Sequence, residues 1–337
     1  MLALALPPFK TSFFAFGALI PFFLLLESKS YRGTFRWGYI TGFIICTLGL
    51  FWIGWVTISG LLGALLVIPL YTTLFALGYT VLRRNLGDKG LVFIPFLWVA
   101  IEYLQTLGDT AFQWLALGYT QTYYLPWIQF AEYTGVYGVS FLVVSINVLG
   151  YLLIRHHNRP RIRLLAGGGL AILLILPYVH GLTVMDKLSS KSTLRVALVQ
   201  GNIDPFEKWN AANKKLYFDR YDSLSHSLLP EHPDLIVWPE TATPFYLRYE
   251  YAFLDRIRNL VDQNQISLLT GSVDLEHHVE TVEYYNSALL FTPKEQTIQH
   301  YAKMKLVPFS EKVPYDNMFP FNVLKTFLYD MKLGIGD

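Results

Sequence analysis

Leu235-Ile-Val-Trp238-Pro239-Glu240 is a short apolar run that ends in a proline and a carboxylate. A continuous apolar run of this length, followed by turn residues, is typical of a strand that is buried on both faces of a parallel sheet. In open α/β sheets, ligands bind beyond the carboxyl ends of the strands. The sequence therefore predicts that Glu240 lies at the ligand-binding edge of an α/β sheet.

Strand and helix patterns alternate on both sides of this run. Strands are predicted from their apolar and β-branched content, and helices from apolar residues repeated at intervals of three and four. The predicted strands are 194–200, 235–238, 267–273, 284–292 and 297–301, and the predicted helices are 209–229 and 245–264. This order predicts an α/β layer domain, which we place at residues 187–337.

Residues 1–186 have a different composition. The whole chain is 53% hydrophobic and only 15% charged, whereas about a quarter of the residues are charged in an average soluble protein. The deficit lies in long apolar runs of roughly the 20 residues that are needed to cross a bilayer. Six windows qualify: 11–27, 37–58, 60–82, 90–107, 127–154 and 164–183. The sequence therefore predicts a multi-span α-helical membrane domain at residues 1–186.

Basic residues indicate how these spans are oriented. Three of the five connections are basic, and the two that alternate with them, 56–60 and 105–126, have neither lysine nor arginine. The basic residues are Lys29, Arg32 and Arg36, then Arg83, Arg84 and Lys89, then Arg155, Arg159, Arg161 and Arg163. Because basic loops stay in the cytoplasm, we expect the domain after the sixth span to lie on the opposite side.

Other features narrow the possible partners. The net charge of +2 is too small to indicate a nucleic-acid partner. The single cysteine, Cys46, lies inside an apolar run and provides neither a disulfide framework nor a cysteine-based metal site. Glu102 lies inside a predicted span, where a charged group usually faces a bundle interior or a cavity, and a structural ion pair or an interfacial position near the span end stays open. Phe112–Tyr119 is apolar but too short to cross, which leaves a re-entrant or an interfacial position open.

Glu240 and Lys303 have two interpretations from spacing alone. Each follows a predicted strand, so the pair could act as base and electrostatic stabiliser, or both could be solvated loop charges. Three stretches favour the first interpretation, because together they resemble the nitrilase (carbon–nitrogen hydrolase) superfamily. They are Arg195-Val-Ala-Leu-Val-Gln-Gly-Asn202, Val237-Trp-Pro-Glu240-Thr-Ala and Tyr301-Ala-Lys303-Met-Lys-Leu-Val-Pro-Phe-Ser-Glu311-Lys-Val-Pro314. The residues that follow the lysine, from Leu306 to Pro314, resemble the membrane branch of this superfamily, apolipoprotein N-acyltransferase. The upstream segments 4–9, 98–103 and 114–121 resemble the same branch.

The resemblance implies an αββα sandwich and a Glu–Lys–Cys triad. It makes Glu240 the general base, Lys303 the oxyanion partner and Glu311 a supporting second glutamate. Trp114 and Trp209 match substrate-side tryptophans, although packing roles for both remain open. The implied reaction is the last step of lipoprotein maturation. An acyl chain passes from a phospholipid, through a cysteine thioester, to the amino group of the S-diacylglyceryl-cysteine that begins an apolipoprotein. We expect neither a metal nor a cofactor, and a bacterial inner-membrane protein whose hydrolase domain faces the periplasm or exterior.

The sequence departs from the family pattern in two places. No cysteine follows Cys46, so we expect a C-terminally incomplete chain that is inactive alone. The family commonly has Gly-Phe-Pro-Trp where this sequence has Ala111-Phe-Gln-Trp114, and it often has an arginine where this sequence has Gln105. These differences leave the details of substrate binding open. Two alternatives remain: a membrane-tethered amidase of the nitrilase type, and a non-catalytic membrane scaffold. A transporter is disfavoured because the spans carry few polar residues besides Glu102.

Overall fold

The computed structural model describes residues 1–55, 57–187, 194–204, 207–277, 281–308, 311–315 and 317–318. These residues form two compact units. The first comprises the helices up to residue 187 together with Pro308, and the second is built on a sheet and comprises the other described residues from 194 onward. Phe309 and Ser310 of the lysine motif, and residues 319–337 of the predicted hydrolase domain, lie outside the described residues.

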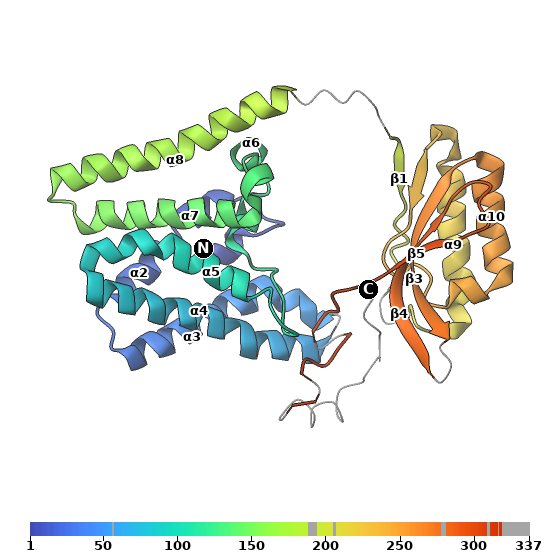
Figure 1. Cartoon of the computed structure of the whole chain (residues 1–337), viewed down its shortest axis with the longest axis horizontal. Coiled ribbons are helices and arrows are strands. Elements are labelled where there is room, and N and C mark those ends of the chain that lie inside the picture. The colour runs from blue at the N-terminus through green and yellow to red at the C-terminus, as the bar shows by residue number, and fades with distance from the viewer. Residues whose placement is uncertain are drawn as a thin grey trace. The chain divides into compact units, whose positions relative to one another are not determined.

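The first unit is helical (Figure 1). Its α-helices are α1 (Leu2–Ala5), α2 (Ile20–Leu26), α3 (Tyr31–Leu50), α4 (Ile58–Leu86), α5 (Ile94–Leu104), α6 (Leu125–Ile128), α7 (Ala131–Arg155) and α8 (Pro160–Lys187). Within the described residues, four helical stretches are long and apolar enough to cross a membrane: Tyr31–Trp55, Ile58–Leu104, Ala131–Arg155 and Pro160–Lys187. The prediction of a multi-span helical domain is therefore confirmed.

Two of the six predicted windows contain shorter helices. In the window 11–27 the helical path is divided into a 3₁₀ turn, Ser12–Phe16, and α2 of seven residues, with Gly17 between them. In the window 90–107 a 3₁₀ stretch precedes α5, which has 11 residues. The count of six spans stays a prediction.

Small residues bring α3 and α4 close together. A Cβ atom added to Gly42 would lie 2.9 Å from Pro69 Cα, and one added to Gly38 would lie 2.9 Å from Thr73 Cα. Small residues let the backbones of membrane helices pack closely. This packing stabilises helix pairs in lipid, where the hydrophobic effect contributes little to helix association.

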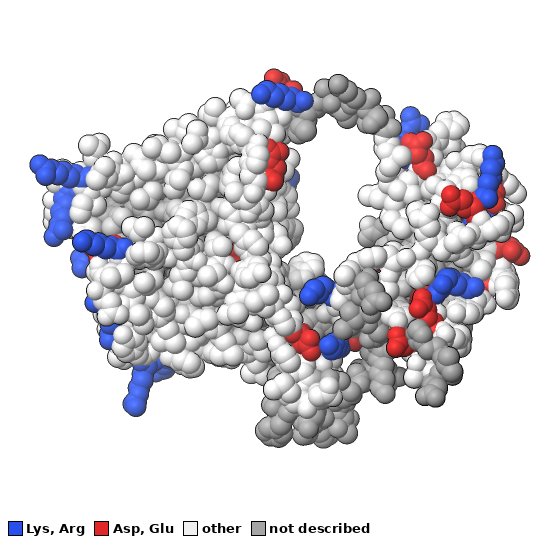
Figure 2. Space-filling model, in the orientation of Figure 1, with Lys and Arg blue, Asp and Glu red and all other residues white. Residues whose placement is uncertain are grey.

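Basic side chains gather at the end of this unit where α3 begins and α4 ends (Figure 2). There Arg84 donates to the Lys29 carbonyl at 2.8 Å, and Arg155 pairs with Glu27 at 3.0 Å. Arg83 pairs with Asp88 at 2.7 Å. Residues from the three predicted basic connections are therefore joined at one end of the unit.

Glu102 faces the interior of the membrane unit and is only 3% exposed. Its Oε1 atom accepts hydrogen bonds from the Trp98 indole and from the Leu117 backbone N–H, both at 2.7 Å. The second contact fixes the start of a 3₁₀ turn, Leu117–Gln121, within the short apolar stretch between α5 and α6. Glu102 therefore occupies the bundle interior, where it also lines a small cavity of about 60 Å³, and its carboxylate joins two segments of the bundle.

The second unit contains one mixed five-stranded sheet. Its strands are β1 (Val196–Leu198), β2 (Leu235–Val237), β3 (Ser267–His277), β4 (Val282–Phe291) and β5 (Gln299–Ala302). They pair in the order β1-β2-β3-β4-β5. The pairs β1–β2 and β2–β3 are parallel, and β3–β4 and β4–β5 are antiparallel. Helices α9 (Lys214–Ser227) and α10 (Tyr251–Asn264) cover one face of the sheet (Figure 1). The predicted α/β fold is confirmed.

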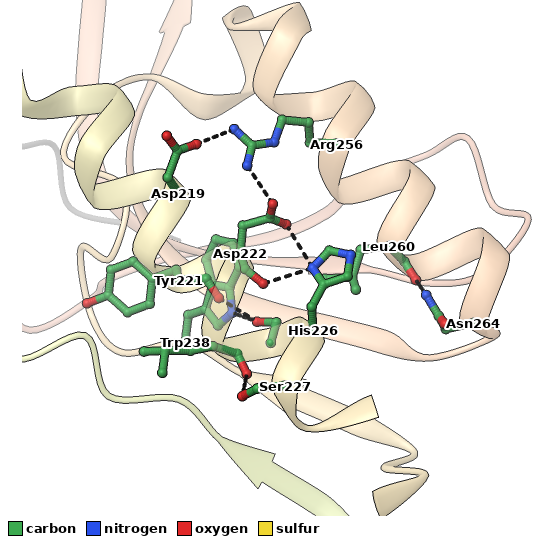
Figure 3. Close-up of polar contacts among 11 residues, drawn as sticks. Asp219, Tyr221, Asp222, His226, Ser227, Trp238, Arg256, Leu260 and Asn264 are labelled. Carbon is green, nitrogen blue, oxygen red and sulfur yellow. Dashed lines mark hydrogen bonds and ion pairs between the residues drawn. The ribbon is translucent and has the colours of Figure 1, made fainter. Parts of the chain in front are cut away.

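The buried core beneath these helices holds the end of β2 in place. Trp238 is 2% exposed and stacks on Tyr221 of α9, with ring centroids 5.2 Å apart. Its indole N–H donates to the Ser225 hydroxyl at 2.8 Å. Arg256 of α10 in turn bonds the two α9 carboxylates Asp219 and Asp222, each at 2.5 Å (Figure 3). This network anchors the chain two residues before Glu240.

Replacing Ser225 with valine is predicted to weaken this anchor. The buried Trp238 N–H would lose its acceptor, which costs roughly 1–3 kcal/mol. Hydrogen–deuterium exchange of the amides at 235–238 should therefore accelerate roughly 5- to 150-fold. Ser223→Val is the matched control, because Ser223 lies on the exposed side of the same helix. Equal exchange rates in the two variants would contradict this role of the Ser225 hydroxyl.

Candidate active site

The turn that carries Glu240 passes directly over β3. Trp238 N–H donates to the Leu269 carbonyl at 2.8 Å, and Gly271 N–H donates to the Pro239 carbonyl at 3.2 Å. A Cβ atom on Gly271 would lie 2.6 Å from Glu240 Cα, a separation that backbone atoms cannot accept. Thr241, directly after the glutamate, has a positive φ of 47°. The sheet can therefore present Glu240 here only because residue 271 is a glycine.

Lys303 lies just beyond β5 and is shared by two carboxylates. Its backbone N–H donates to the Asn286 carbonyl at 2.8 Å, which extends the pairing of β5 with β4 by one residue. Its Nζ atom lies 3.0 Å from Glu240 Oε1 and 2.9 Å from Glu311 Oε2. The Glu311 side chain is only 13% exposed, whereas that of Glu240 is 63% exposed. The ammonium thus joins a more buried carboxylate to a more accessible one.

Asn286 on β4 completes the cluster. Its Nδ2 group donates to Glu240 Oε1 at 2.5 Å and to Glu311 Oε1 at 3.0 Å, and the residue is 6% exposed. Sequence reasoning missed this residue. No local pattern singled it out, because the same strand also carries the polar residues Glu283 and Ser287.

The cluster favours the charged forms of Glu240 and Lys303. Burial opposes ionisation of Glu240, but hydrogen bonds from Lys303 and Asn286, with the charges of Lys303 and Lys208, hold the pKa of that carboxyl below its usual value. Burial likewise opposes the charge on Lys303, but hydrogen bonds to Glu311 and Glu240 raise the pKa of its ammonium. At neutral pH the site therefore presents a carboxylate and an ammonium.

A cleft of about 540 Å³ opens beside these groups. It is lined by Trp238, Glu240, Leu269, Gly271, Asn286, Ser287, Ala288, Tyr301, Lys303, Met304 and Lys305. A carboxylate that accepts a proton and an ammonium that stabilises an oxyanion, side by side in a cleft, suit acyl transfer. Among the described residues, no group of three or more His, Cys, Asp or Glu side chains is arranged to hold a metal ion.

The structure thus brings Glu240, Lys303 and Glu311 together, whereas neither of the two predicted tryptophans is among the residues that line this cleft. Trp209 is 50% exposed in the loop after β1. Trp114 belongs to the membrane unit, is 60% exposed, and packs on Trp52 with ring centroids 5.1 Å apart. There it lines a separate pocket of about 510 Å³.

Cys46 lacks the solvent access that a nucleophilic cysteine needs. It is fully buried in α3, and its thiol lies 3.7 Å from the Ala64 carbonyl of α4. That this cysteine takes no part in the chemistry stays a prediction.

Family models match both units. Residues 195–325 match carbon-nitrogen hydrolase, and residues 1–149 match the apolipoprotein N-acyltransferase N-terminal domain. Among solved structures, a carbon-nitrogen hydrolase from Helicobacter pylori G27 covers 43% of this chain and 45% of its own, with 17% identity and a TM-score of 0.28. From the family models, the second unit is a carbon–nitrogen hydrolase domain joined to a membrane domain.

Curated relatives define the family more closely. The apolipoprotein N-acyltransferase of Geobacter metallireducens is 34% identical over all of this chain and 66% of its own length. That of Chlorobaculum tepidum is 32% identical over 91% of this chain and 62% of its own. The chain belongs to the apolipoprotein N-acyltransferase family, and it is a multi-pass membrane protein. It spans about two thirds of the length of these relatives.

The lowered pKa of Glu240 predicts how acid affects stability. A carboxyl whose folded pKa is depressed stabilises the fold above its unfolded pKa, and this contribution is lost as the pH falls through the folded pKa. Glu240→Gln should therefore lower the midpoint of thermal unfolding at pH 7, and the difference from wild type should shrink below the usual glutamate value of 4.5. Glu231→Gln, on an exposed turn away from the cluster, is the control. A difference that stays constant down to pH 3 would contradict the assignment.

Proposed function

We propose that the full-length protein N-acylates apolipoproteins through a cysteine thioester, with Glu240 as general base and Lys303 as oxyanion partner. One observation carries the proposal, namely the Lys303 ammonium held between Glu240 and Glu311 in the cleft of a carbon–nitrogen hydrolase domain. The relatives' name, apolipoprotein N-acyltransferase, supplies the reaction class. The acyl donor is a membrane phospholipid, and the acceptor is the amino group of an S-diacylglyceryl-cysteine.

The first half of the reaction forms the thioester. The cysteine thiol, which residues 1–337 do not supply at this site, gives its proton to the Glu240 carboxylate. The thiolate then attacks the ester carbonyl of the phospholipid. The single bond between the carbonyl carbon and the bridging oxygen of the ester then breaks. That oxygen leaves with the lysophospholipid and takes the proton back from Glu240. The Lys303 ammonium stabilises the oxyanion that forms on the carbonyl oxygen.

The second half passes the acyl group on. The amine of the acceptor attacks the thioester and loses a proton to Glu240, the carbon–sulfur bond breaks, and the departing sulfur is protonated again. The products are an amide and the free thiol. Glu311, the more buried carboxylate, keeps Lys303 charged and in place throughout, because it holds the ammonium by a second ion pair at 2.9 Å.

The membrane unit offers an apolar pocket for lipid chains. Leu6, Leu50, Trp52, Trp114 and Leu115 are among the residues that line the pocket of about 510 Å³. Apolar and aromatic linings of this kind suit acyl chains. We propose that Trp114 contacts the lipid chains of a substrate here, and that Trp209, exposed in the loop after β1, contacts substrate on the hydrolase domain.

Substitutions at the two central residues test the proposal. In the full-length protein, Glu240→Gln should lower the rate of thioester formation about 10²–10⁴-fold, and Lys303→Ala about 10²–10³-fold. Because both act on one step, the double variant should lose much less than the product of the single losses. The measurement follows labelled acyl chains from phospholipid onto the protein and then onto a diacylated lipopeptide.

Matched controls separate chemistry from general damage. Lys215→Met and Glu231→Gln remove exposed charges on the same domain and should leave the rates unchanged. The 337-residue chain alone should transfer no acyl group, with or without Cys46. Full thioester formation in both Glu240→Gln and Lys303→Ala would show that these residues are not the catalytic pair.

The proposed location is the bacterial inner membrane, with the hydrolase domain outside the cytoplasm. On a Cys46→Ser background, single cysteines at positions 84 and 159 should be shielded from a membrane-impermeant thiol reagent in intact cells without an outer-membrane barrier. A cysteine at position 215, where the native side chain is 77% exposed, should be labelled at once. Labelling of position 215 only after the inner membrane is permeabilised would reverse the predicted orientation.

A further inference from the structure

Lys208 lies in the loop after β1 and contacts the turn that carries Glu240. Its Nζ atom donates to the Glu240 carbonyl at 3.2 Å and to the Thr241 hydroxyl. Both acceptors are uncharged, so neither contact neutralises the ammonium. Lys208 is half-buried, and the loss of water around it lowers the pKa of its amine. A lysine placed in this way is expensive to keep charged unless nearby negative charge compensates for the lost water.

The negative charge that compensates belongs to the catalytic cluster. Glu240 and Glu311 carry two negative charges, and Lys303 supplies one positive charge between them. Without Lys208 the cluster has a net charge of −1, and with Lys208 the sum is zero. Among the described residues, Lys208 reaches the glutamate from the β1 loop, whereas Lys303 reaches it from the end of β5. The two lysines therefore approach the Glu240 residue from separate elements.

Backbone geometry adds a second reason for the contact. Thr241 has a φ of 47°, which threonine adopts only at a cost, so the turn needs bonds that hold it there. The Lys208 ammonium binds the Glu240 carbonyl and the Thr241 side chain together, on either side of that strained link. Loss of the ammonium would free the turn to relax and move Glu240.

We propose that Lys208 is a positioning residue for Glu240, which fixes the Pro239–Thr241 turn and supplies the second positive charge that keeps the base ionised. The inference rests on the proposed function for its catalytic consequence. The other groups that face Glu240 are Lys303, Asn286 and Glu311, and the cleft is also lined by Tyr301 and Lys305. None of these groups holds the backbone of the turn as Lys208 does.

Direct titration of Glu240 tests the inference without any acyl transfer. The ¹³C carboxyl signals of labelled glutamate are followed against pH in the present chain, and the Glu240 signal is assigned by its loss in Glu240→Gln. Lys208→Met should raise the pKa of Glu240 by on the order of half a unit to one unit. Lys208→Arg keeps the charge and should raise it by much less. Lys215→Met removes an exposed charge bound to Asp219 and should leave it unchanged.

A second variant guards against misfolding of Lys208→Met. Thr241→Val keeps a β-branched side chain and the lysine but removes the hydroxyl acceptor, so it should produce a smaller shift in the same direction. An unchanged Glu240 pKa in both Lys208→Met and Thr241→Val would overturn the inference. So would a shift in Lys208→Arg as large as that in Lys208→Met.

The catalytic consequence is measured in the full-length protein. The acid limb of the pH–rate profile for thioester formation should move to higher pH in Lys208→Met, and this is a change that a purely structural lysine would not cause. An unmoved acid limb, together with a strong loss in Glu240→Gln, would overturn the role of Lys208 and leave the proposed function standing. Full activity in Glu240→Gln would instead sink the proposed function, while the titration still decides whether Lys208 positions the carboxylate.

Discussion

One ammonium group shared by two carboxylates is the interaction on which the hydrolase domain's site depends. Leaving Glu311 partly buried without a cation would cost several kcal/mol, because a desolvated charge needs a partner. Lys303 supplies that partner and at the same time faces the accessible Glu240. Asn286 donates one hydrogen bond to each carboxylate and so fixes the distance between them. The charges are thus arranged before a substrate arrives, as electrostatic stabilisation of a transition state requires.

The fold supplies this arrangement through contacts that have no direct part in chemistry. The Trp238 indole, held by Tyr221 and Ser225, fixes the end of β2. Gly271 then lets the turn after β2 pass over β3 at a distance that any larger residue would block. These two constraints explain why a buried strand followed by proline and glutamate forms a site, and why a glycine in the next strand is part of it.

Much of this domain could be predicted from the sequence because its strands are short apolar runs and its helices have clear apolar spacing. The five strands were predicted closely, apart from the extension of β3 to His277, but the two helices begin later than predicted, at Lys214 and Tyr251. Spacing alone could not show that Glu240 and Lys303 meet, because they lie 63 residues apart and the antiparallel register of β4 and β5 brings them together. Asn286 and Lys208 were missed because their importance comes from what they contact, not from a local pattern. In the membrane unit, the apolar windows predicted the helices, but window length could not show where Gly17 and 3₁₀ stretches divide them.

The most direct test of the account is a structure of the full-length protein trapped as its acyl thioester. The proposed chemistry requires the thioester carbonyl oxygen to lie where the Lys303 ammonium can stabilise the developing negative charge. The account predicts a separation of about 2.7–3.1 Å between that oxygen and Lys303 Nζ, with Glu240 within hydrogen-bond reach of the sulfur. An acylated cysteine whose carbonyl lies away from Lys303, or an acyl group attached to another residue, would contradict it.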